Sequence, residues 1–429
     1  MPSRVTSGRE IAVVGAGWAG LAAAVEATRA GARVTLLEMA QLAGGRARDV
    51  VSHGSVLDNG AHICIGAYRE TLRLLREVGV EEGQAFERSP LTLVDAEGRG
   101  LRMRGGTPIP AFALAVLGRG GWSWRDRFSL LRVAARWRRS GFRALPDATV
   151  ADLAADLPAA VRRDFIEPLC IAALNTSMAE ASGAVFLRVL HDALAGSPGA
   201  ADLLLPRVGL GSLFPQPALA WLERAGATVR LAHRAERIDR DGGTWRIDDV
   251  LADRVIVAAS AAEAARLTAP HAGGWAALAA ALRYEPIVTV YARSAGCTLP
   301  QSLIALHADA ERPAQFVFDR GRLGGEPGML AFVISGASSW VERGTAAAET
   351  ATLTQANAEL ARFLRAPLVV VRTIVEKRAT FACTPGLARP PMNVAGGLFA
   401  CGDYLDGPYP ATLEGAVRSG VAAARAALA

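Results

Sequence analysis

The sequence is short of lysine and cysteine, and it contains no long apolar run. Of its 47 lysines and arginines, only Lys377 is a lysine. The five cysteines are odd in number and scattered, with no CxxC pair, which argues against a disulfide framework or a structural zinc site and favours a reducing compartment. The first ten residues, MPSRVTSGRE, hold no apolar signal core, so we expect a cytoplasmic protein that is not secreted.

The composition is that of an ordinary globular protein. Of the 429 residues, 51% are hydrophobic and 21% are charged, which excludes a disordered chain. The length predicts about two or three domains, and it is enough to bury a large core without disulfides or metals. We therefore expect no metal site.

Positive charge is concentrated in one segment. The net charge is +6, and residues 105–145 contain eight arginines against a single acid, Asp126. The rest of the chain is therefore close to neutral. A protein that binds nucleic acid would spread its positive charge over a wider surface, so we expect no nucleic-acid partner.

The same segment combines apolar, aromatic and basic residues. The apolar run 108–117 is far too short to cross a bilayer, and Trp122 and Trp124 follow it. An arginine-rich helix with Phe128 on one side comes next. This combination predicts a peripheral anchor on an anionic membrane surface, at the inner face of the cell membrane. The alternative is a solvated helix whose apolar stripe packs into the core.

The N-terminal region has the pattern of a strand, a glycine-rich turn, a helix and a second strand. Apolar residues 11–14 predict a strand that is buried on both faces, and the run GAGWAG at 15–20 follows at once. An alanine-rich helix then extends to about Ala30, and residues 33–37 predict the second strand. Glu38 stands at the carboxyl end of that strand.

The three glycines of this turn, Gly15, Gly17 and Gly20, have separate physical roles. The first permits a tight turn, the second lets the backbone approach a pyrophosphate, and the third lets helix and strand pack closely. The phosphates then lie at the helix N-terminus, where free amides and the helix dipole favour an anion. Glu38 is placed to accept hydrogen bonds from ribose hydroxyls. The unit therefore predicts a dinucleotide site.

Further strand signals lie far along the chain. Asp-Gly-Gly at 241–243 predicts a turn between short strands. Residues 67–200 are mainly helical in pattern, and residues 285–340 have strand character. We therefore expect an α/β fold, in which a Rossmann-like nucleotide-binding domain carries an inserted α+β substrate domain. The short strands are predicted at 228–231, 235–238, 245–247 and 254–258, the nucleotide-binding domain at 1–66, 202–262 and 390–429, and the substrate-binding domain at 67–201 and 263–389.

A second glycine pair identifies the dinucleotide. Gly44-Gly45-Arg46 follows the ribose-binding acid and resembles the extended FAD motif of the amine oxidase and phytoene desaturase superfamily. Near the other end of the chain, Gly402 and Asp403 resemble the part of that pattern that binds the ribityl chain and the diphosphate. The resemblance implies FAD as the cofactor and places FAD contacts at Gly15, Ala16, Gly17, Trp18, Ala19, Gly20, Glu38, Gly44, Gly45, Arg46, Asn59, Gly60, Ala235, Gly402, Asp403, Thr412 and Leu413.

The last helix of the chain follows this motif. In the superfamily it directs its N-terminus at the flavin pyrimidine carbonyl, where reduced flavin carries negative charge. Residues 410–416 mark its expected start here. Glu414 and Arg418 are four residues apart, the spacing of an ordinary surface ion pair on a helix.

The chain as a whole resembles the hydroxysqualene dehydroxylases, the squalene-associated flavoproteins of bacterial hopanoid biosynthesis. The similar segments occur in order over nearly the whole chain, which makes chance similarity a poor explanation. They are LDNGAHICIGAYRETLRLL (57–75), PLCIAALNTSMAEASGAVFLRVL (168–190), DLLLPRVGLGSLFPQPALAWL (202–222), QFVFDRG (315–321), EKRATFACTPGLARPP (376–391) and GDYLDGPYPATLEGAVRSG (402–420).

The resemblance implies that reduced FAD removes the hydroxyl group of hydroxysqualene and leaves squalene. The allylic alcohol is protonated and leaves as water, and hydride from flavin N5 then reaches the allylic cation. The protein must supply an acid, an apolar tunnel for a long-chain isoprenoid, and exclusion of water. The sequence holds no second nucleotide motif and no cysteine cluster for iron and sulfur, so an unknown electron donor must reduce the flavin.

Four residues are candidates for the acid, and each has a structural alternative. His62 and Asp58 follow the FAD motif and are expected under the flavin, and their alternative is a hydrogen-bonded turn. Lys377 would share a strand face with apolar residues, where a lysine needs a partner. It could hold a water near flavin N5, as a lysine does in related amine oxidases. Its alternative is an ion pair with a carboxylate. Asp319 is the fourth candidate, and its alternative is a turn.

Two other functions fit the same sequence. An FAD-dependent desaturase or oxidase of a carotenoid-type polyene would share the fold, but it would produce reduced flavin rather than consume it. A non-catalytic flavin-binding scaffold for isoprenoid enzymes would bind FAD and show no turnover. The direction of electron flow therefore separates the three hypotheses.

Overall fold

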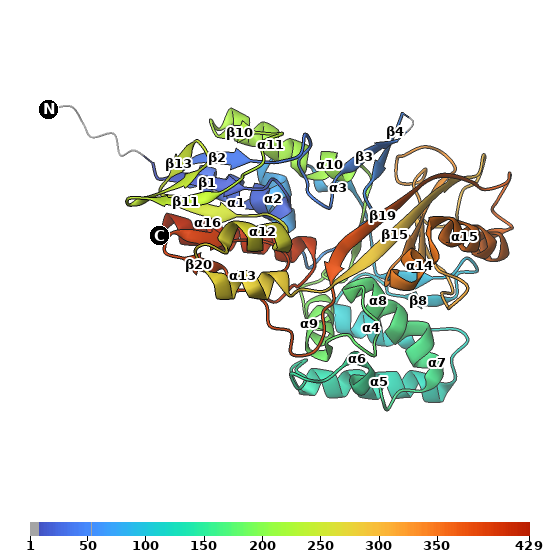
Figure 1. Ribbon diagram of the computed structural model, residues 1–429. Helices are drawn as coiled ribbons and strands as arrows, with labels where there is room; N and C mark the ends of the chain where they lie inside the picture. The colour runs from blue at the N-terminus through green and yellow to red at the C-terminus, as the bar shows by residue number, and fades with distance from the viewer. Residues whose placement is uncertain (1–7, 53) are drawn as a thin grey trace.

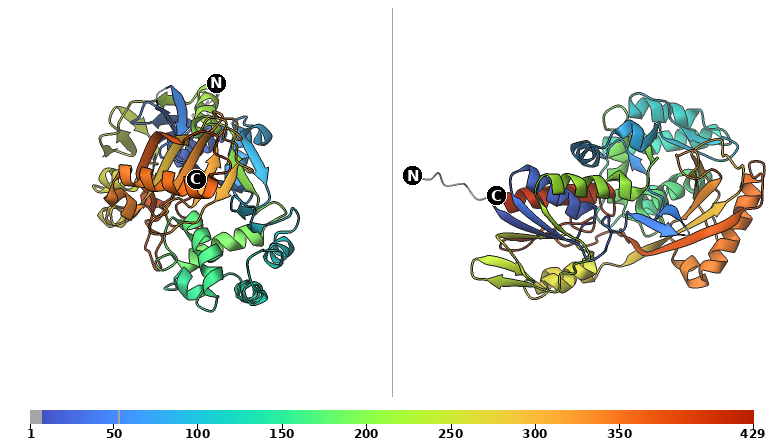
Figure 2. Two further views of the ribbon diagram at one scale, coloured as in Figure 1. Left: turned by 90° about the vertical axis from the view of Figure 1, so that its right-hand side faces the viewer. Right: turned by 90° about the horizontal axis from the view of Figure 1, so that it is seen from above.

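The computed structural model describes residues 8–52 and 54–429. Residues 1–7, at the start of the predicted 1–66 segment, and residue 53 lie outside the described residues. A parallel sheet with its helices forms one end of the molecule, where the C-terminus lies. An antiparallel sheet and a group of helices form the other end (Figures 1 and 2).

The parallel sheet has six strands, and neighbours pair in parallel except at one edge. All of these strands lie within the segments predicted for the nucleotide-binding domain, while the division into two domains stays a prediction. In spatial order the strands are β10 (Thr228–Arg230), β2 (Arg33–Leu37), β1 (Glu10–Val14), β14 (Arg254–Val257), β21 (Leu398–Ala400) and β20 (Asn393–Ala395).

Three helices cover one face of this sheet (Figure 1). The helix α1 (Trp18–Arg29) packs along α16 (Leu413–Leu428), and α11 (Pro215–Arg224) lies beside α1. Ile11 belongs to the core on this face, whereas its neighbour Ala12 belongs to the core on the opposite face. The prediction that the first strand is buried on both faces is therefore confirmed.

A small antiparallel sheet and two helices cover the other face. The strand predicted at 235–238 is wrong, because the first strand of this small sheet starts only at Ile238. The amides of Glu236 and Arg237 donate instead to the carboxylate of Asp248, at 3.2 and 3.3 Å, so they are not free for a strand ladder. The elements on this face are β11 (Ile238–Asp241), β12 (Thr244–Ile247), β13 (Val250–Ala252), α12 (Ala261–Thr268) and α13 (Gly273–Ala280).

The second large sheet is antiparallel and has helices on one face only. Along one of its strands, Val317 faces the helices, whereas Phe316 and Phe318 face the opposite side. This alternation is that of a sheet with two different surroundings. In spatial order the strands are β16 (Leu303–Ala305), β17 (Phe316–Asp319), β18 (Met329–Ile334), β15 (Tyr284–Arg293) and β19 (Val369–Phe381), and the helices are α14 (Ser338–Arg343) and α15 (Thr345–Leu360).

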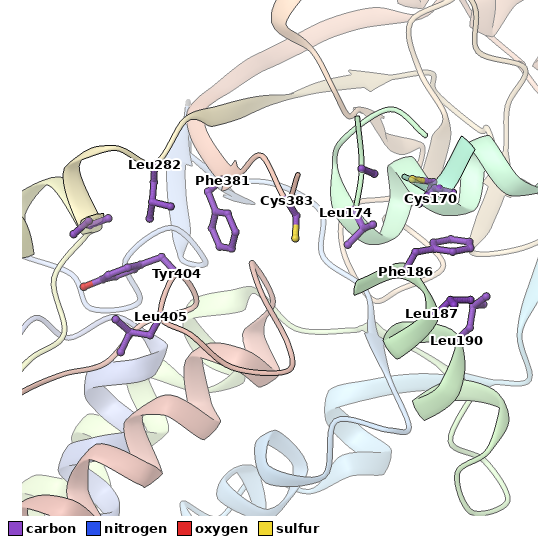
Figure 3. Close-up of a cluster of buried hydrophobic side chains, with 14 of the residues drawn as sticks. Cys170, Leu174, Phe186, Leu187, Leu190, Leu282, Phe381, Cys383, Tyr404 and Leu405 are labelled. Atoms are coloured by element: carbon purple, nitrogen blue, oxygen red, sulfur yellow. The ribbon is translucent and has the colours of Figure 1, made fainter. Parts of the chain in front are cut away.

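Residues 67–200 form mainly helices, as predicted, and short strands occur within and on either side of this region. Their core is continuous with the core beneath the parallel sheet, because Leu174, Phe186 and Tyr404 belong to one buried cluster (Figure 3). The helices are α2 (Arg69–Glu77), α3 (Glu82–Ala85), α4 (Pro108–Leu117), α5 (Trp124–Arg139), α6 (Val150–Leu153), α7 (Ala159–Val161), the π-helix η1 (Arg162–Ile166), α8 (Glu167–Leu174) and α9 (Gly183–Leu194), with α10 (Leu210–Leu213) further on. The short strands are β3 (Asp49–Ser52), β4 (Ser55–Asp58), β5 (Cys64–Ile65), β6 (Phe86–Ser89), β7 (Thr92–Val94), β8 (Gly100–Arg102) and β9 (Leu203–Pro206).

The predicted anchor segment is divided between the core and the surface. Trp122 is buried and donates its Nε1–H to Asp164 at 3.3 Å, and Leu130 lies in the core. Trp124 and Phe128 are exposed. The alternative of an apolar stripe packed into the core therefore holds for part of the segment. No helix in residues 8–52 and 54–429 is long and apolar enough to cross a bilayer.

Glu414 and Arg418 form the predicted ion pair, but Glu414 is fully buried, so the prediction of an ordinary surface pair is wrong. The Glu414 carboxylate accepts hydrogen bonds from the amides of Glu70 and Thr71, at 3.1 and 2.9 Å, and from Thr71 Oγ1 at 2.8 Å. Arg418 lies 3.6 Å away, and burial raises the pKa of Glu414. The residue therefore caps the N-terminus of α2 and joins it to α16, a role that spacing within one helix does not reveal.

Gly420 lies where α16 packs on α1, and a Cβ atom there would lie 2.1 Å from the carbonyl oxygen of Ala19. We expect Gly420→Ala to lower the free energy of unfolding by about 1–3 kcal/mol, because the helices must move apart. Urea denaturation measures this loss. The control Gly274→Ala, whose new Cβ would meet no atom within 4 Å, should unfold like the wild type. Equal destabilisation by both would contradict the close helix contact.

Candidate active site

A cavity of about 910 Å³ lies at the carboxyl ends of the parallel strands. Val14, Leu37, Ala258 and Gly402, which end or follow four of these strands, all line it. Open α/β sheets bind their ligands at this edge. The opposite wall comes from the antiparallel sheet and from α8, so the cavity lies where the two ends of the molecule meet.

The first glycine turn opens directly into this cavity. Gly15 has a φ of +109°, and a Cβ at Gly20 would lie 1.8 Å from the carbonyl oxygen of Gly15, so strand and helix pack as closely as predicted. Gly17 is the N-cap of α1 and provides no side-chain cap. The first amides of α1 are therefore available to an anion such as a diphosphate.

Glu38 is fixed at the end of β2 by two backbone amides. Its Oε2 accepts a hydrogen bond from Ala16 N at 2.6 Å, and its Oε1 accepts one from Ala40 N at 2.8 Å. The carboxylate is buried and lines the cavity. Each oxygen retains a second lone pair, so the group can still accept hydrogen bonds from ribose hydroxyls.

Arg46 connects the second glycine pair to the far end of the chain. Its guanidinium forms an ion pair with Asp403 and donates to the carbonyl oxygen of Ala379 at 2.6 Å. Burial by itself lowers the pKa of Arg46, but Asp403 together with Tyr284 and Glu376 outweighs this effect, so the pKa is raised. Asn59 Nδ2 donates to the carbonyl of Arg46 at 2.9 Å, which holds the loop in place.

A second helix also begins at the cavity. Thr412 is the N-cap of α16, and its Oγ1 accepts a hydrogen bond from Gly415 N at 2.9 Å. Thr412 and Leu413 line the cavity, while Ala235 lines it at the end nearest β2 and Glu38. All residues predicted for FAD line the cavity except Ala16 and Gly20. The contacts of all these residues with FAD stay a prediction.

His62 is the cavity-lining member of the four acid candidates. Its Nδ1 lies 2.8 Å from the carbonyl oxygen of Gly60. A carbonyl only accepts, so Nδ1 carries the proton in the neutral ring and Nε2 is left as the second titratable nitrogen. Burial lowers the pKa of His62 below its usual value of 6.5. The geometry therefore permits proton transfer at Nε2.

The two predicted aspartates have structural partners and do not line the cavity. Asp58 accepts a hydrogen bond from Leu210 N at 2.8 Å and lies 3.5 Å from Arg320. Asp319 accepts hydrogen bonds from Leu299 N at 2.8 Å and from Arg322 N at 3.0 Å. Both are buried, Asp58 against the first amide of α10 and Asp319 at the turn that follows β17, so structural hydrogen bonding describes them better than the acid role.

Lys377 is exposed and lies outside the cavity lining, which corrects its predicted place on a buried apolar face. The adjacent Glu376 lines the cavity instead, where its Oε2 accepts a hydrogen bond from Asn59 Nδ2 at 3.0 Å. Ile374, two residues before Glu376, packs in the core on the cavity side of the sheet, whereas Val375 packs on the helix side. Side chains alternate along a strand, so Glu376 reaches the cavity and the face predicted for Val375 and Lys377 points away from it.

The other half of the cavity is apolar, and α8 and the antiparallel sheet form its wall. These two elements are joined by Asn175, which ends α8 in a left-handed conformation with a φ of 49°. Its Nδ2 donates to Thr380 Oγ1 at 2.9 Å, and its Oδ1 accepts from Gly336 N at 2.6 Å. The apolar lining consists of Ala61, Ile63, Ile171, Ala172, Ala173, Ile287, Phe316, Phe318 and Val333.

Comparisons with known proteins agree with this architecture. The family model of flavin containing amine oxidoreductases matches residues 18–428. The chain is 27% identical to the hydroxysqualene dehydroxylase of Sinorhizobium fredii, in a match that covers 98% of this chain and 98% of that protein. It is 29% identical to the hydroxysqualene dehydroxylase of Rhodopseudomonas palustris, in a match that covers 98% of this chain and 99% of that protein. The solved structure of cyclohexylamine oxidase from Brevibacterium oxydans matches with a TM-score of 0.69 at 17% identity, over 98% of this chain and 99% of that one. The predicted resemblance and fold class are confirmed.

Arg46 offers a test of the polar half of the cavity. We expect Arg46→Gln to weaken flavin binding at least tenfold, because the change leaves Asp403 without its cation and removes a positive charge from the diphosphate region. Flavin titration, with flavin absorbance per protein after gel filtration, measures the loss. Arg372→Gln, at an exposed arginine on β19, is the matched control and should bind like the wild type. Wild-type affinity in Arg46→Gln would contradict the assignment.

Proposed function

Since the chain belongs to the flavin containing amine oxidoreductase family and is an FAD-dependent oxidoreductase, we propose that it removes the hydroxyl group of hydroxysqualene to give squalene. The observation that carries this proposal is the divided cavity. A half shaped for a dinucleotide meets a half lined by aliphatic and aromatic side chains, and His62 lines the same space. The full-length similarity to hydroxysqualene dehydroxylases supports the same substrate.

The residues of the polar half fit FAD. The open N-terminus of α1 and Arg46 would hold the diphosphate, Glu38 would hold the adenosine ribose, and Asp403 would hold the ribityl chain. A side chain at Gly45 would lie 3.3 Å from the Cα of Gly17, so the two glycine turns form a cradle that larger residues would fill. When bound and reduced, FAD supplies the hydride for the substrate carbon.

The protein's own contribution is a proton and a dry surrounding. We assign to His62 the role of holding a proton at Nε2 and giving it to the substrate hydroxyl, which leaves as water. One proton and one hydride enter for each water released, so the reaction balances. The apolar lining from α8 and the antiparallel sheet keeps other water from the carbon that loses its hydroxyl group. The electron donor that reduces the flavin is a separate partner.

Anaerobic single turnover tests the reaction. The protein is reduced with dithionite and mixed with hydroxysqualene in detergent, and we expect squalene to form in step with flavin reoxidation. Mass spectrometry and flavin absorbance follow the two processes. Reduced flavin that stays reduced, with no squalene, would reject the proposal. In that case the oxidised protein is offered carotenoid-type polyenes, where flavin bleaching would indicate a desaturase and silence would indicate a scaffold.

The pH profile tests His62. Only the protonated ring carries a proton at Nε2 for the hydroxyl, so we expect the rate of squalene formation to fall about tenfold per pH unit above the pKa of His62, which burial holds below 6.5. The rate should level off below that pKa. His62→Gln should lower the rate by about 10²–10⁴-fold and remove this pH dependence. His233→Gln, at a cavity histidine beside Ala235, should keep it when FAD is saturating. If His62→Gln keeps the pH dependence as His233→Gln does, the role of His62 is refuted.

A further inference from the structure

The helix α5 has two different faces. Leu130, Val133 and Trp137 are buried and pack into the core. With 3.6 residues per turn, Trp124 and Phe128 lie on the opposite side, and their exposed fractions are 62% and 59%. The outer face therefore carries large aromatic side chains that the core does not use.

The two exposed aromatic rings form a fixed pair at the start of α5. Their centroids are 5.9 Å apart with an interplanar angle of 27°, and the Arg127 guanidinium lies 4.6 Å from the Trp124 ring. Ser123 and Asp126 close a capping box that fixes this end of the helix. The pair is thus held on a regular helix, not on a loop.

Arginines surround the aromatic pair on the same outer face. Arg125, Arg132 and Arg139 are exposed, and among the described residues none of them forms a hydrogen bond or an ion pair within 4 Å, although Arg132 helps to lower the pKa of the nearby Asp156. Arg136 is also exposed, but it pairs with Asp156 at 2.7 Å. We call Trp124, Phe128, Arg125, Arg132 and Arg139 the arginine–aromatic face. It presents apolar area together with positive charge that exceeds the single nearby carboxylate of Asp156.

The arginine–aromatic face belongs to the group of helices that forms part of the cavity wall. The helix α5 packs on α7, the π-helix η1 follows α7, and α8 continues from η1 to line the cavity at Ile171. The neighbouring helix α4 has no charged residue and leaves Leu114 63% exposed. The surface and the apolar half of the cavity are therefore parts of one helical unit.

We propose that the arginine–aromatic face docks the protein on an anionic lipid bilayer. Tryptophan and phenylalanine enter the boundary between headgroups and acyl chains, and the unpaired guanidiniums bind lipid phosphates. A nucleic acid would use positive charge spread over a wide surface, whereas the charge of this chain is concentrated in residues 105–145. A second copy of this chain would bring the same positive charge to the contact. The purpose of docking rests on the proposed function, because a long-chain isoprenoid is stored in the bilayer.

Vesicle binding tests the proposal with the FAD-loaded full-length protein. We expect it to sediment with phosphatidylglycerol vesicles and not with phosphatidylcholine vesicles, and binding should weaken as salt rises. Equal binding to both kinds of vesicle, or to neither, would overturn the proposal. A duplex DNA that binds more tightly than the anionic vesicles would also overturn it, in favour of nucleic acid.

Matched variants assign the binding to this face. We expect Arg125→Gln/Arg132→Gln/Arg139→Gln to lower the partition coefficient by about fivefold for each arginine removed. Trp124→Ala/Phe128→Ala should lower it at least tenfold. The controls remove three exposed arginines elsewhere, in Arg76→Gln/Arg224→Gln/Arg372→Gln, or one exposed apolar side chain, in Leu251→Ala. Both controls should bind like the wild type, and an equal loss in test and control variants would refute the assignment.

Turnover of detergent-solubilised hydroxysqualene separates this proposal from the proposed function. The arginine and aromatic variants should retain wild-type flavin content and wild-type turnover in detergent, which shows that they fold. Turnover without vesicle binding would overturn the docking proposal and leave the proposed function intact. Vesicle binding that depends on this face, without turnover of hydroxysqualene, would support docking and reject the proposed function.

Discussion

The ion pair between Arg46 and Asp403 joins two motifs that lie 357 residues apart in the sequence. The same guanidinium also donates to the carbonyl of Ala379 in β19, so one side chain links the loop after β2, the loop after β21 and the antiparallel sheet. A buried or half-buried charge stays charged only when it is paired and hydrogen-bonded. Arg46 therefore holds the two ends of the molecule together at the wall of the cavity, in addition to the buried hydrophobic cluster that they share.

The cavity places two kinds of chemistry next to each other. On one side, two helix N-termini, two glycine turns and Glu38 provide backbone amides and carboxylate oxygens for a large polar cofactor. On the other side, α8 and the antiparallel sheet provide an apolar surface for a hydrocarbon chain. His62 lines the same cavity, with its tautomer fixed by the carbonyl of Gly60. A proton held there is close to an apolar substrate and away from bulk water.

The candidate acids illustrate where reasoning from sequence fails. Asp58 and Asp319 occur in segments that match the family resemblance, yet each one is buried away from the cavity and accepts a hydrogen bond from a distant backbone amide, that of Leu210 or of Leu299. Lys377 has the right residue type in the right segment, but the predicted face that it shares with Val375 points away from the cavity, and Glu376 lines the cavity instead. Alternation predicts which residues share a face of a strand but not which face meets the cavity, because that depends on how the sheet packs in the fold.

The sequence by itself determined the nucleotide-binding unit: the buried first strand, the glycine turn, the helix from Trp18, and Glu38 at the end of the second strand. These features follow from local requirements, because a tight turn or a positive φ needs glycine at a fixed position. Only the tertiary structure decided that Glu414 caps α2, that Glu376 and not Lys377 reaches the cavity, and that Trp122 is buried while Trp124 is exposed. The partners of these side chains come from elements far away in the sequence, so their roles depend on which elements pack together.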